Sequence, residues 1–168
     1  LQQDLGAAAL LFEIADGIGD RFFDDVIAQD DADFVAVSEM LVSREDYRLV
    51  LQQRAADYTM IDPTWVGGIS ESRRAAELAQ VFNVPTLMHD CTGPLTLFAG
   101  LQISASCANV TYQETVRAHI KTLYPLLIDQ PPVIKSGSIA LPERPGMGVR
   151  LLPELFTPDH PGYRITRL

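Results

Sequence analysis

Five ionisable side chains stand at the ends of five short apolar runs in this 168-residue sequence. They recur at intervals of 26, 23, 27 and 25 residues. Strand-length apolar runs separated by helix-length gaps are typical of βα units, which build parallel sheets. In a (β/α) barrel, the loops at the carboxyl edge of such a sheet hold the chemistry. We therefore expect five residues to lie together at that edge: Glu13, Glu39, Asp62, His89 and Glu114.

The first two residues of the series are carboxylates on neighbouring strands. Glu13 and Glu39 offer the oxygen ligands that hard divalent cations prefer, and Mg²⁺ suits a site with few carboxylates. Zn²⁺ is disfavoured because no second His or Cys falls into the series. Carboxylates gathered at a barrel mouth also need a compensating charge. We predict a magnesium site; the alternative for each residue taken alone is a solvated strand end.

The next residues of the series have the types needed for acid–base chemistry. Asp62 and His89 end adjacent strands, so a hydrogen bond between them would fix the imidazole tautomer and make His89 a general base. The alternative is a core histidine with a chance acceptor. Glu114 could hydrogen-bond a substrate oxyanion or act as a protonated acid. Trp65 is a candidate substrate contact in the loop after Asp62, or an ordinary turn residue.

The hydrophobic pattern predicts the elements that must position these residues. Ser43 and Asp46 form a capping box that opens one helix, whose inner face would reach to Ala55. Ser70 is expected to cap the next helix. The predicted strands are 8–12, 34–37, 58–61, 84–88 and 110–113, and the predicted helices are 20–29, 43–56, 70–82, 94–104 and 115–123.

Composition bounds the organisation and the partners of the chain. We divide it into a partial barrel, residues 1–125, and a tail rich in proline and glycine, residues 126–168, that packs on the barrel or a cap. With 13 Lys and Arg against 22 Asp and Glu, the net charge of −9 argues against nucleic-acid and anionic-membrane binding. The sequence has neither a transmembrane-length apolar run nor a signal-peptide pattern, and two cysteines are too few for a disulfide framework. We expect a cytoplasmic protein.

The five residues and their neighbours resemble the C-terminal half of one branch of the enolase superfamily, that of mandelate racemase and muconate lactonizing enzyme. The resemblance spans about residues 5 to 155. It rests on these pieces: Phe12-Glu13, Val37-Ser38-Glu39-Met40, Ile61-Asp62 with Val66-Gly67-Gly68-Ile69, Leu87-Met88-His89, Asn109 to Glu114, and Pro142 to Val149.

This resemblance implies strands 4 to 8 of a TIM-type barrel, about five βα units. It also implies Mg²⁺-dependent removal of the proton next to a carboxylate, through an enediolate intermediate. By position, Glu13 and Glu39 look like metal ligands, and Asp62 and His89 like the base dyad. Glu114 looks like the glutamate that contacts the substrate carboxylate.

The stretch from Asp90 to Pro94 is similar to that of acid-sugar dehydratases in the same branch. We therefore expect dehydration of an acid sugar, by an enzyme that is a homo-oligomer at full length. The sequence departs from the family at Glu13-Ile14-Ala15-Asp16, where a proline-containing Glu-Glu-Pro stretch is usual. The first metal ligand and the second-strand lysine are expected upstream of Leu1. Two alternatives stay open: a non-catalytic relic that folds only with a partner, and a racemase or cycloisomerase.

Overall fold

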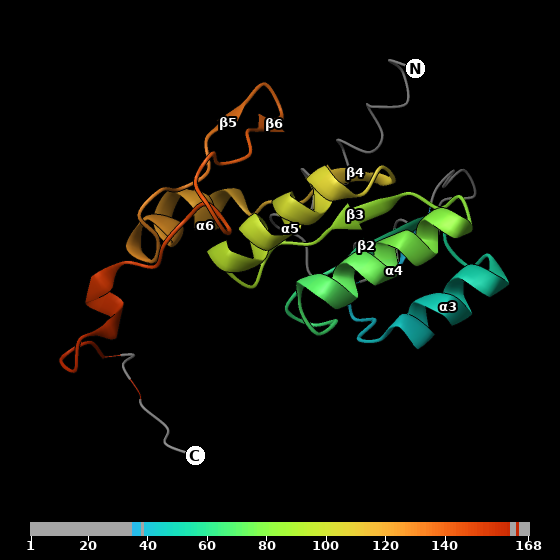
Figure 1. The fold of residues 1–168 in the computed structure, drawn as a ribbon, viewed down its shortest axis with the longest axis horizontal. Coiled ribbons are helices and arrows are strands. Elements are labelled where there is room, and N and C mark those ends of the chain that lie inside the picture. Colours follow the sequence, from blue (N-terminus) through green and yellow to red (C-terminus); the bar gives the residue numbers. More distant parts are fainter. Residues whose placement is uncertain (1–34, 38, 162–163, 165–168) are drawn as a thin grey trace.

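A computed structural model describes residues 35–37, 39–161 and 164, and its centre is a parallel sheet (Figure 1). The sheet holds four strands in chain order: β1 (Ala36–Val37), β2 (Tyr58–Ile61), β3 (Thr86–Met88) and β4 (Val110–Gln113). Every neighbouring pair is parallel. Each of these strands falls within a predicted one. The predicted strand 8–12, Glu13 and the predicted helix 20–29 lie outside the described residues.

A helix follows each strand, which confirms the predicted βα repetition. These helices are α3 (Arg44–Gln53), α4 (Ile69–Val81), α5 (Pro94–Ser106) and α6 (Arg117–Thr122). The first three pack on one face of the sheet, where α4 contacts β2 and α5 contacts β3 and β4 (Figure 1). Their shared core buries apolar side chains from helices and strands alike, among them Tyr47, Leu51, Ile61, Ala75 and Met88.

Helix α3 begins at the predicted capping box. The Ser43 hydroxyl accepts the Asp46 backbone N–H at 3.2 Å, and the Asp46 carboxylate accepts the Ser43 backbone N–H at 3.0 Å. The helix ends earlier than predicted, because Arg54 adopts the left-handed conformation with φ 51°. The expectation that Ala55 lies on the inner helical face is therefore wrong, and this residue is exposed.

Replacing Ser43 with alanine should lower the free energy of unfolding by about 1 kcal/mol, because the Asp46 backbone N–H loses its acceptor, the Ser43 hydroxyl. Urea unfolding followed by circular dichroism measures the change. Ser70→Ala is the matched control, since Ser70 is exposed and α4 has no side-chain cap. Its effect should stay within about 0.5 kcal/mol. Equal losses in both variants would contradict the capping role of Ser43.

The start of α4 differs from the prediction. The N-cap is Gly68 rather than Ser70, and Gly67 and Gly68 have φ of 104° and 98°, a region that favours glycine. The Ser72 hydroxyl donates to the Gly68 carbonyl at 2.9 Å. Two consecutive glycines thus turn the chain from the carboxyl edge of β2 into the helix, and the N-cap lies two residues before the predicted serine.

The C-terminal segment packs against α5. It contains the short helices η1 (Tyr124–Leu126) and η2 (Pro153–Phe156) and the hairpin β5 (Ile134–Lys135) and β6 (Ser138–Ile139). A second apolar cluster joins this segment to the helix, with these members: Leu97, Phe98, Leu101, Tyr124 and Ile128, flanked by Met147, Val149 and Leu151. The boundary at residue 125 stays a prediction.

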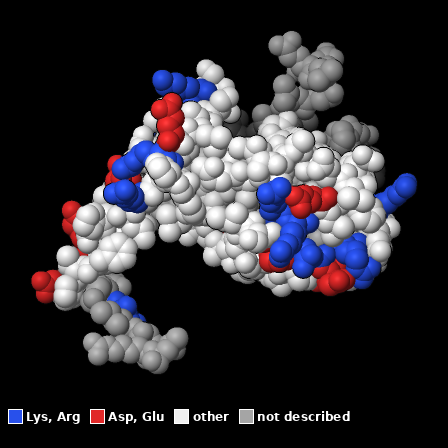
Figure 2. Space-filling view, in the orientation of Figure 1, with Lys and Arg blue, Asp and Glu red and all other residues white. Residues whose placement is uncertain are grey.

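The helical surface of α3 and α4 carries interleaved charges. Figure 2 shows acidic and basic side chains side by side there. Glu71 pairs with Arg44 at 2.7 Å and with Arg74 at 2.5 Å, and Arg73 pairs with Glu77 at 2.8 Å. In the part of the chain that the structure describes, no helix is long and apolar enough to cross a membrane.

Candidate active site

Strand register brings three of the predicted site residues to one edge. Ile61 pairs with Met88, and Met88 pairs with Gln113, across three parallel strands. The backbone ladder continues one step further, with hydrogen bonds from His89 N to Ile61 O and from Glu114 N to Met88 O. The residues that directly follow the three paired positions are therefore neighbours: Asp62, His89 and Glu114.

These side chains point away from the covering helices. Ile61 and Met88 are fully buried in the core between the sheet and the helices. Because successive side chains alternate between the two faces of a strand, Asp62 and His89 project to the opposite face. That face would be the interior of a closed barrel.

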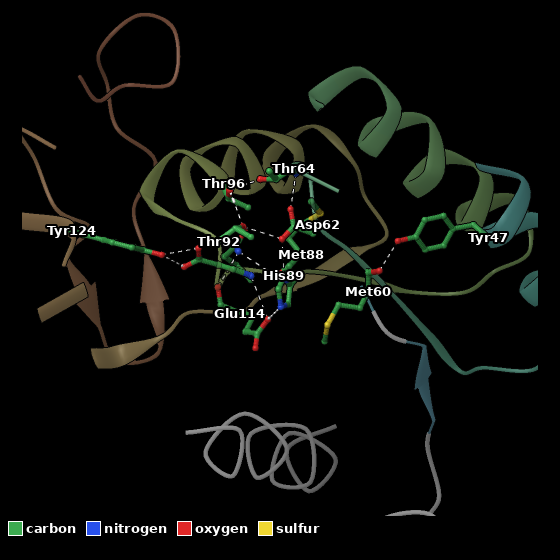
Figure 3. Close-up of polar contacts among 12 residues, drawn as sticks. Tyr47, Met60, Asp62, Thr64, Met88, His89, Thr92, Thr96, Glu114 and Tyr124 are labelled. Atoms are coloured by element: carbon green, nitrogen blue, oxygen red, sulfur yellow. Dashed lines mark hydrogen bonds and ion pairs between the residues drawn. The ribbon is translucent and has the colours of Figure 1, made fainter. Parts of the chain in front are cut away.

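Asp62 and His89 form the predicted dyad. His89 Nδ1 lies 2.8 Å from Asp62 Oδ2, and the Asp62 side chain is fully buried (Figure 3). An ionised carboxylate only accepts hydrogen bonds, so Nδ1 carries the proton and Nε2 keeps a free lone pair. Nε2 lies 3.5 Å from Glu114 Oε2. The one imidazole nitrogen able to take a proton thus faces the third residue of the edge.

Threonines hold the Asp62 carboxylate from the other side. The Thr64 backbone N–H donates to Oδ1 at 2.6 Å, and the Thr92 hydroxyl lies 3.0 Å from Oδ2. The Thr96 hydroxyl is 2.6 Å from that of Thr64 and 3.0 Å from that of Thr92 (Figure 3). Burial raises the pKa of Asp62, but hydrogen bonds led by that of His89 outweigh it, and the net pKa lies below its ordinary value. Asp62 is therefore ionised.

The same neighbours tune His89 and Glu114. Burial alone would lower the pKa of His89, but the Asp62 hydrogen bond and the negative charges of Glu114 and Glu39 bring it above its ordinary value. Burial raises the pKa of Glu114, and the charges of Glu39 and Asp62 raise it further against the opposing effect of His89. Both pKa values are thus shifted in the direction of neutral pH, where general acids and bases work best.

Glu39 is the one predicted metal ligand that falls within the described residues. It is half-buried and follows β1 by two residues. Its charge raises the pKa of both His89 and Glu114, which places it within electrostatic range of the dyad. Within the described ranges, no group of three His, Cys, Asp or Glu side chains could hold a metal ion by itself. Glu13 lies outside those ranges.

Trp65 lies in the turn directly after β2, as predicted. Its side chain is 43% exposed, and its backbone N–H donates to the Asp62 carbonyl at 3.2 Å. The turn therefore extends from the dyad itself. A role for Trp65 in substrate binding stays a prediction.

Several polar residues around the site were missed from the sequence. Thr64, Thr92 and Thr96 support Asp62, while Asp90 and Tyr124 form a buried pair beside His89. Threonine is too common in loops to signal such a role by type. The sequence singled out Asp90 only as the first residue of the dehydratase-like stretch 90–94, and not as a partner of Tyr124.

The chain matches known proteins over most of its described length. Residues 31–155 match the model of the family described as enolase C-terminal domain-like. One curated relative is the D-xylonate dehydratase of Haloferax volcanii, 29% identical over 117 residues, which are 70% of this chain and 28% of the relative. Another is the arabinonate dehydratase of Saccharolobus solfataricus, 25% identical over 122 residues, 73% of this chain and 32% of the relative. The chain thus spans less than a third of either.

The chain is also similar to a crystal structure of an enolase of the mandelate racemase subgroup from Agrobacterium tumefaciens, which contains sodium and phosphate. It is 39% identical, with a TM-score of 0.66 over 71% of this chain and 32% of that chain. The expected fold class is thereby confirmed: an α/β chain with the parallel strands and helices of part of a TIM-type barrel.

Proposed function

The chain belongs to the enolase C-terminal domain-like family, and from that premise we propose that it carries the base of an acid-sugar dehydratase. The curated relatives support this reaction class, since they include dehydratases of xylonate and arabinonate. The observation that carries the proposal is the His89–Asp62 dyad, with Nε2 of His89 turned toward Glu114. An imidazole held in one tautomer beside two carboxyl groups is the arrangement that a general base needs.

The reaction begins with a proton transfer to His89. Nε2 takes the proton on the carbon next to the substrate carboxylate, while Asp62 holds Nδ1–H and stabilises the imidazolium that forms. The electron pair of the broken C–H bond then expels hydroxide from the neighbouring carbon. The His89 imidazolium returns its proton to this hydroxide, which leaves as water. The resulting enol becomes a 2-oxo acid. This is the product of dehydration of any 2,3-dihydroxy acid.

Glu114 is suited to receive the substrate carboxylate. Burial raises the pKa of Glu114 above its ordinary value, and this favours the neutral acid, which can donate a hydrogen bond. As the proton leaves carbon, negative charge grows on the substrate carboxylate. A donor aimed at that charge stabilises the transition state more than the substrate.

The described part of this edge holds one predicted metal ligand, the carboxylate of Glu39, which is of the type that a hard cation prefers. Glu39 could supply a carboxylate oxygen to Mg²⁺, and its charge acts on His89 of the dyad. Glu39 would hold the ion together with Glu13 and a ligand upstream. When bound, Mg²⁺ would supply Lewis-acid stabilisation of the charge that proton removal creates.

The test is turnover of a panel of acid sugars by the whole protein that contains this chain. Formation of a 2-oxo acid, followed as its semicarbazone, identifies dehydration. Exchange of the proton next to the carboxylate with D₂O, without a 2-oxo product, would point instead to a racemase. If no sugar acid gives either proton exchange or a 2-oxo product, the proposal is overturned.

Glu39→Gln should weaken Mg²⁺ binding by about 10-fold or more, because a neutral amide replaces a charged oxygen ligand. Isothermal titration of the whole protein with MgCl₂ measures this directly. Glu45→Gln is the control, since Glu45 is an exposed residue of α3 that pairs with Arg48. Unchanged Mg²⁺ affinity in Glu39→Gln would remove Glu39 from the metal site.

A further inference from the structure

A second buried carboxyl group lies directly beside the base. Asp90 follows His89 in the chain, and its side chain is fully buried. Both of its oxygens face one hydroxyl group, with Tyr124 Oη 2.7 Å from Oδ1 and 2.9 Å from Oδ2. None of the ion pairs among the described residues involves Asp90. Among the described residues, the polar anchor of this side chain is therefore the Tyr124 phenol.

The backbone of Asp90 reaches the site itself. Its N–H donates to Glu114 Oε2 at 3.3 Å, and the same oxygen lies 3.5 Å from His89 Nε2. The orientation of the Asp90 peptide therefore sets where the Glu114 carboxyl lies relative to the base. Whatever holds Asp90 in place also holds this pair of reactive groups.

Tyr124 is itself fixed by apolar packing. It is fully buried at η1, in the cluster formed with Leu97, Phe98 and Leu101 of α5 and with Ile128. The His119 ring packs on it at 6.1 Å between centroids. Tyr124 is thus held in place by packing and hydrogen-bonds Asp90, which lies 34 residues earlier in the sequence. It connects the C-terminal segment to the end of β3.

We propose that Asp90 and Tyr124 are a positioning pair, in which the Tyr124 hydroxyl anchors the Asp90 side chain so that the Asp90 backbone N–H holds Glu114 opposite His89. This inference rests on the proposed function for its catalytic consequence. It concerns residues that touch neither the substrate nor a metal.

Burial favours the neutral form of Asp90 in this anchor. One phenol proton cannot satisfy two oxygens of a buried anion, and burial raises the pKa of Asp90 to about 7 despite the Tyr124 hydrogen bond. The charged and titratable groups that face Asp90 are these: Glu114, His89, Asp62 and Cys91, with Tyr124 as its hydrogen-bond partner. An asparagine has the same shape, accepts the same hydrogen bond and lacks the charge, so it should replace Asp90 without loss.

The experiment compares four variants of the whole protein. Tyr124→Phe and Asp90→Ala each remove one half of the pair, and each should lower kcat by about 10- to 100-fold, because displaced reactive groups cost that much. Asp90→Asn should keep kcat within about threefold. Tyr47→Phe is the matched control: Tyr47 is also fully buried and donates one hydrogen bond, to the Met60 carbonyl at 2.7 Å. It should lower Tm as Tyr124→Phe does and leave kcat unchanged.

Selective ¹⁵N labelling of histidine gives a second readout that is independent of turnover. The Nε2 signal of His89 should move in Tyr124→Phe and Asp90→Ala, and should stay in place in Asp90→Asn and Tyr47→Phe. If no acid sugar is turned over but these signals behave as expected, the proposed function fails and the positioning pair stands. An unchanged kcat and spectrum in Asp90→Ala would overturn the pair. A loss of kcat in Asp90→Asn equal to that in Asp90→Ala would contradict the statement that a neutral side chain suffices at position 90.

Discussion

The His89→Asn variant of the whole protein is expected to lose about 10³-fold in kcat and to stop exchanging the substrate proton with D₂O. His89 Nδ1 is held by Asp62 at 2.8 Å, so Nε2 is the one nitrogen free to take a proton. Removing a positioned general base costs on the order of 10²- to 10⁴-fold, and asparagine cannot replace it. Product formation and deuterium incorporation, both followed by proton NMR, measure the two losses.

The matched control is His160→Asn, which changes a histidine of the C-terminal segment after η2 and should leave turnover unchanged. The wild-type pH profile adds a second test, the direction in which kcat/KM changes with pH. Only neutral imidazole accepts a proton, and the pKa of His89 lies above its ordinary 6.5, so kcat/KM should fall as the pH drops through that raised pKa. Wild-type exchange in His89→Asn would assign the base to another residue.

The dyad could be predicted because it depends only on strand periodicity. Parallel strands joined by helices bring their carboxyl ends to one edge, so the residues after β2, β3 and β4 had to be neighbours. The sequence also located the α3 capping box, whose two partners are three residues apart. Interactions set by a single element, or by the order of elements, were open to sequence reasoning.

Features that depend on loop conformation could not be predicted from the sequence. Thr92 reaches Asp62 across 30 residues, and only the path of the loop before Gly93, at φ 151°, turns its hydroxyl inward. Tyr124 meets Asp90 because the segment after α6 folds back over α5, which its mixed apolar and proline-rich sequence did not reveal. Ser70 was mistaken for a cap since the true start of α4 depends on the positive φ of Gly68. Residue types alone carry no such information.

Asp62→Asn should also be severely impaired, for a different reason from His89→Asn. The Asn amide can donate to Nδ1, which favours the tautomer with the proton on Nε2 and leaves no base facing Glu114. In a comparable dyad such a change costs about 10⁴-fold in kcat. Asp62→Asn keeps the imidazole but with its proton on Nε2. Its loss of kcat should therefore be nearly as large as that of His89→Asn.

The pH profile separates this explanation from simple misfolding. The Asp62 hydrogen bond and charge both raise the pKa of His89, so the residual activity of Asp62→Asn should have its acid limb at lower pH than the wild type. Thr92→Val is the graded comparison, because it removes one hydroxyl from a carboxylate that keeps the Thr64 N–H and His89 as donors. It should cost about 10-fold or less, with the tautomer retained. An Asp62→Asn enzyme with full activity and an unshifted acid limb would show that Asp62 neither orients His89 nor sets its basicity.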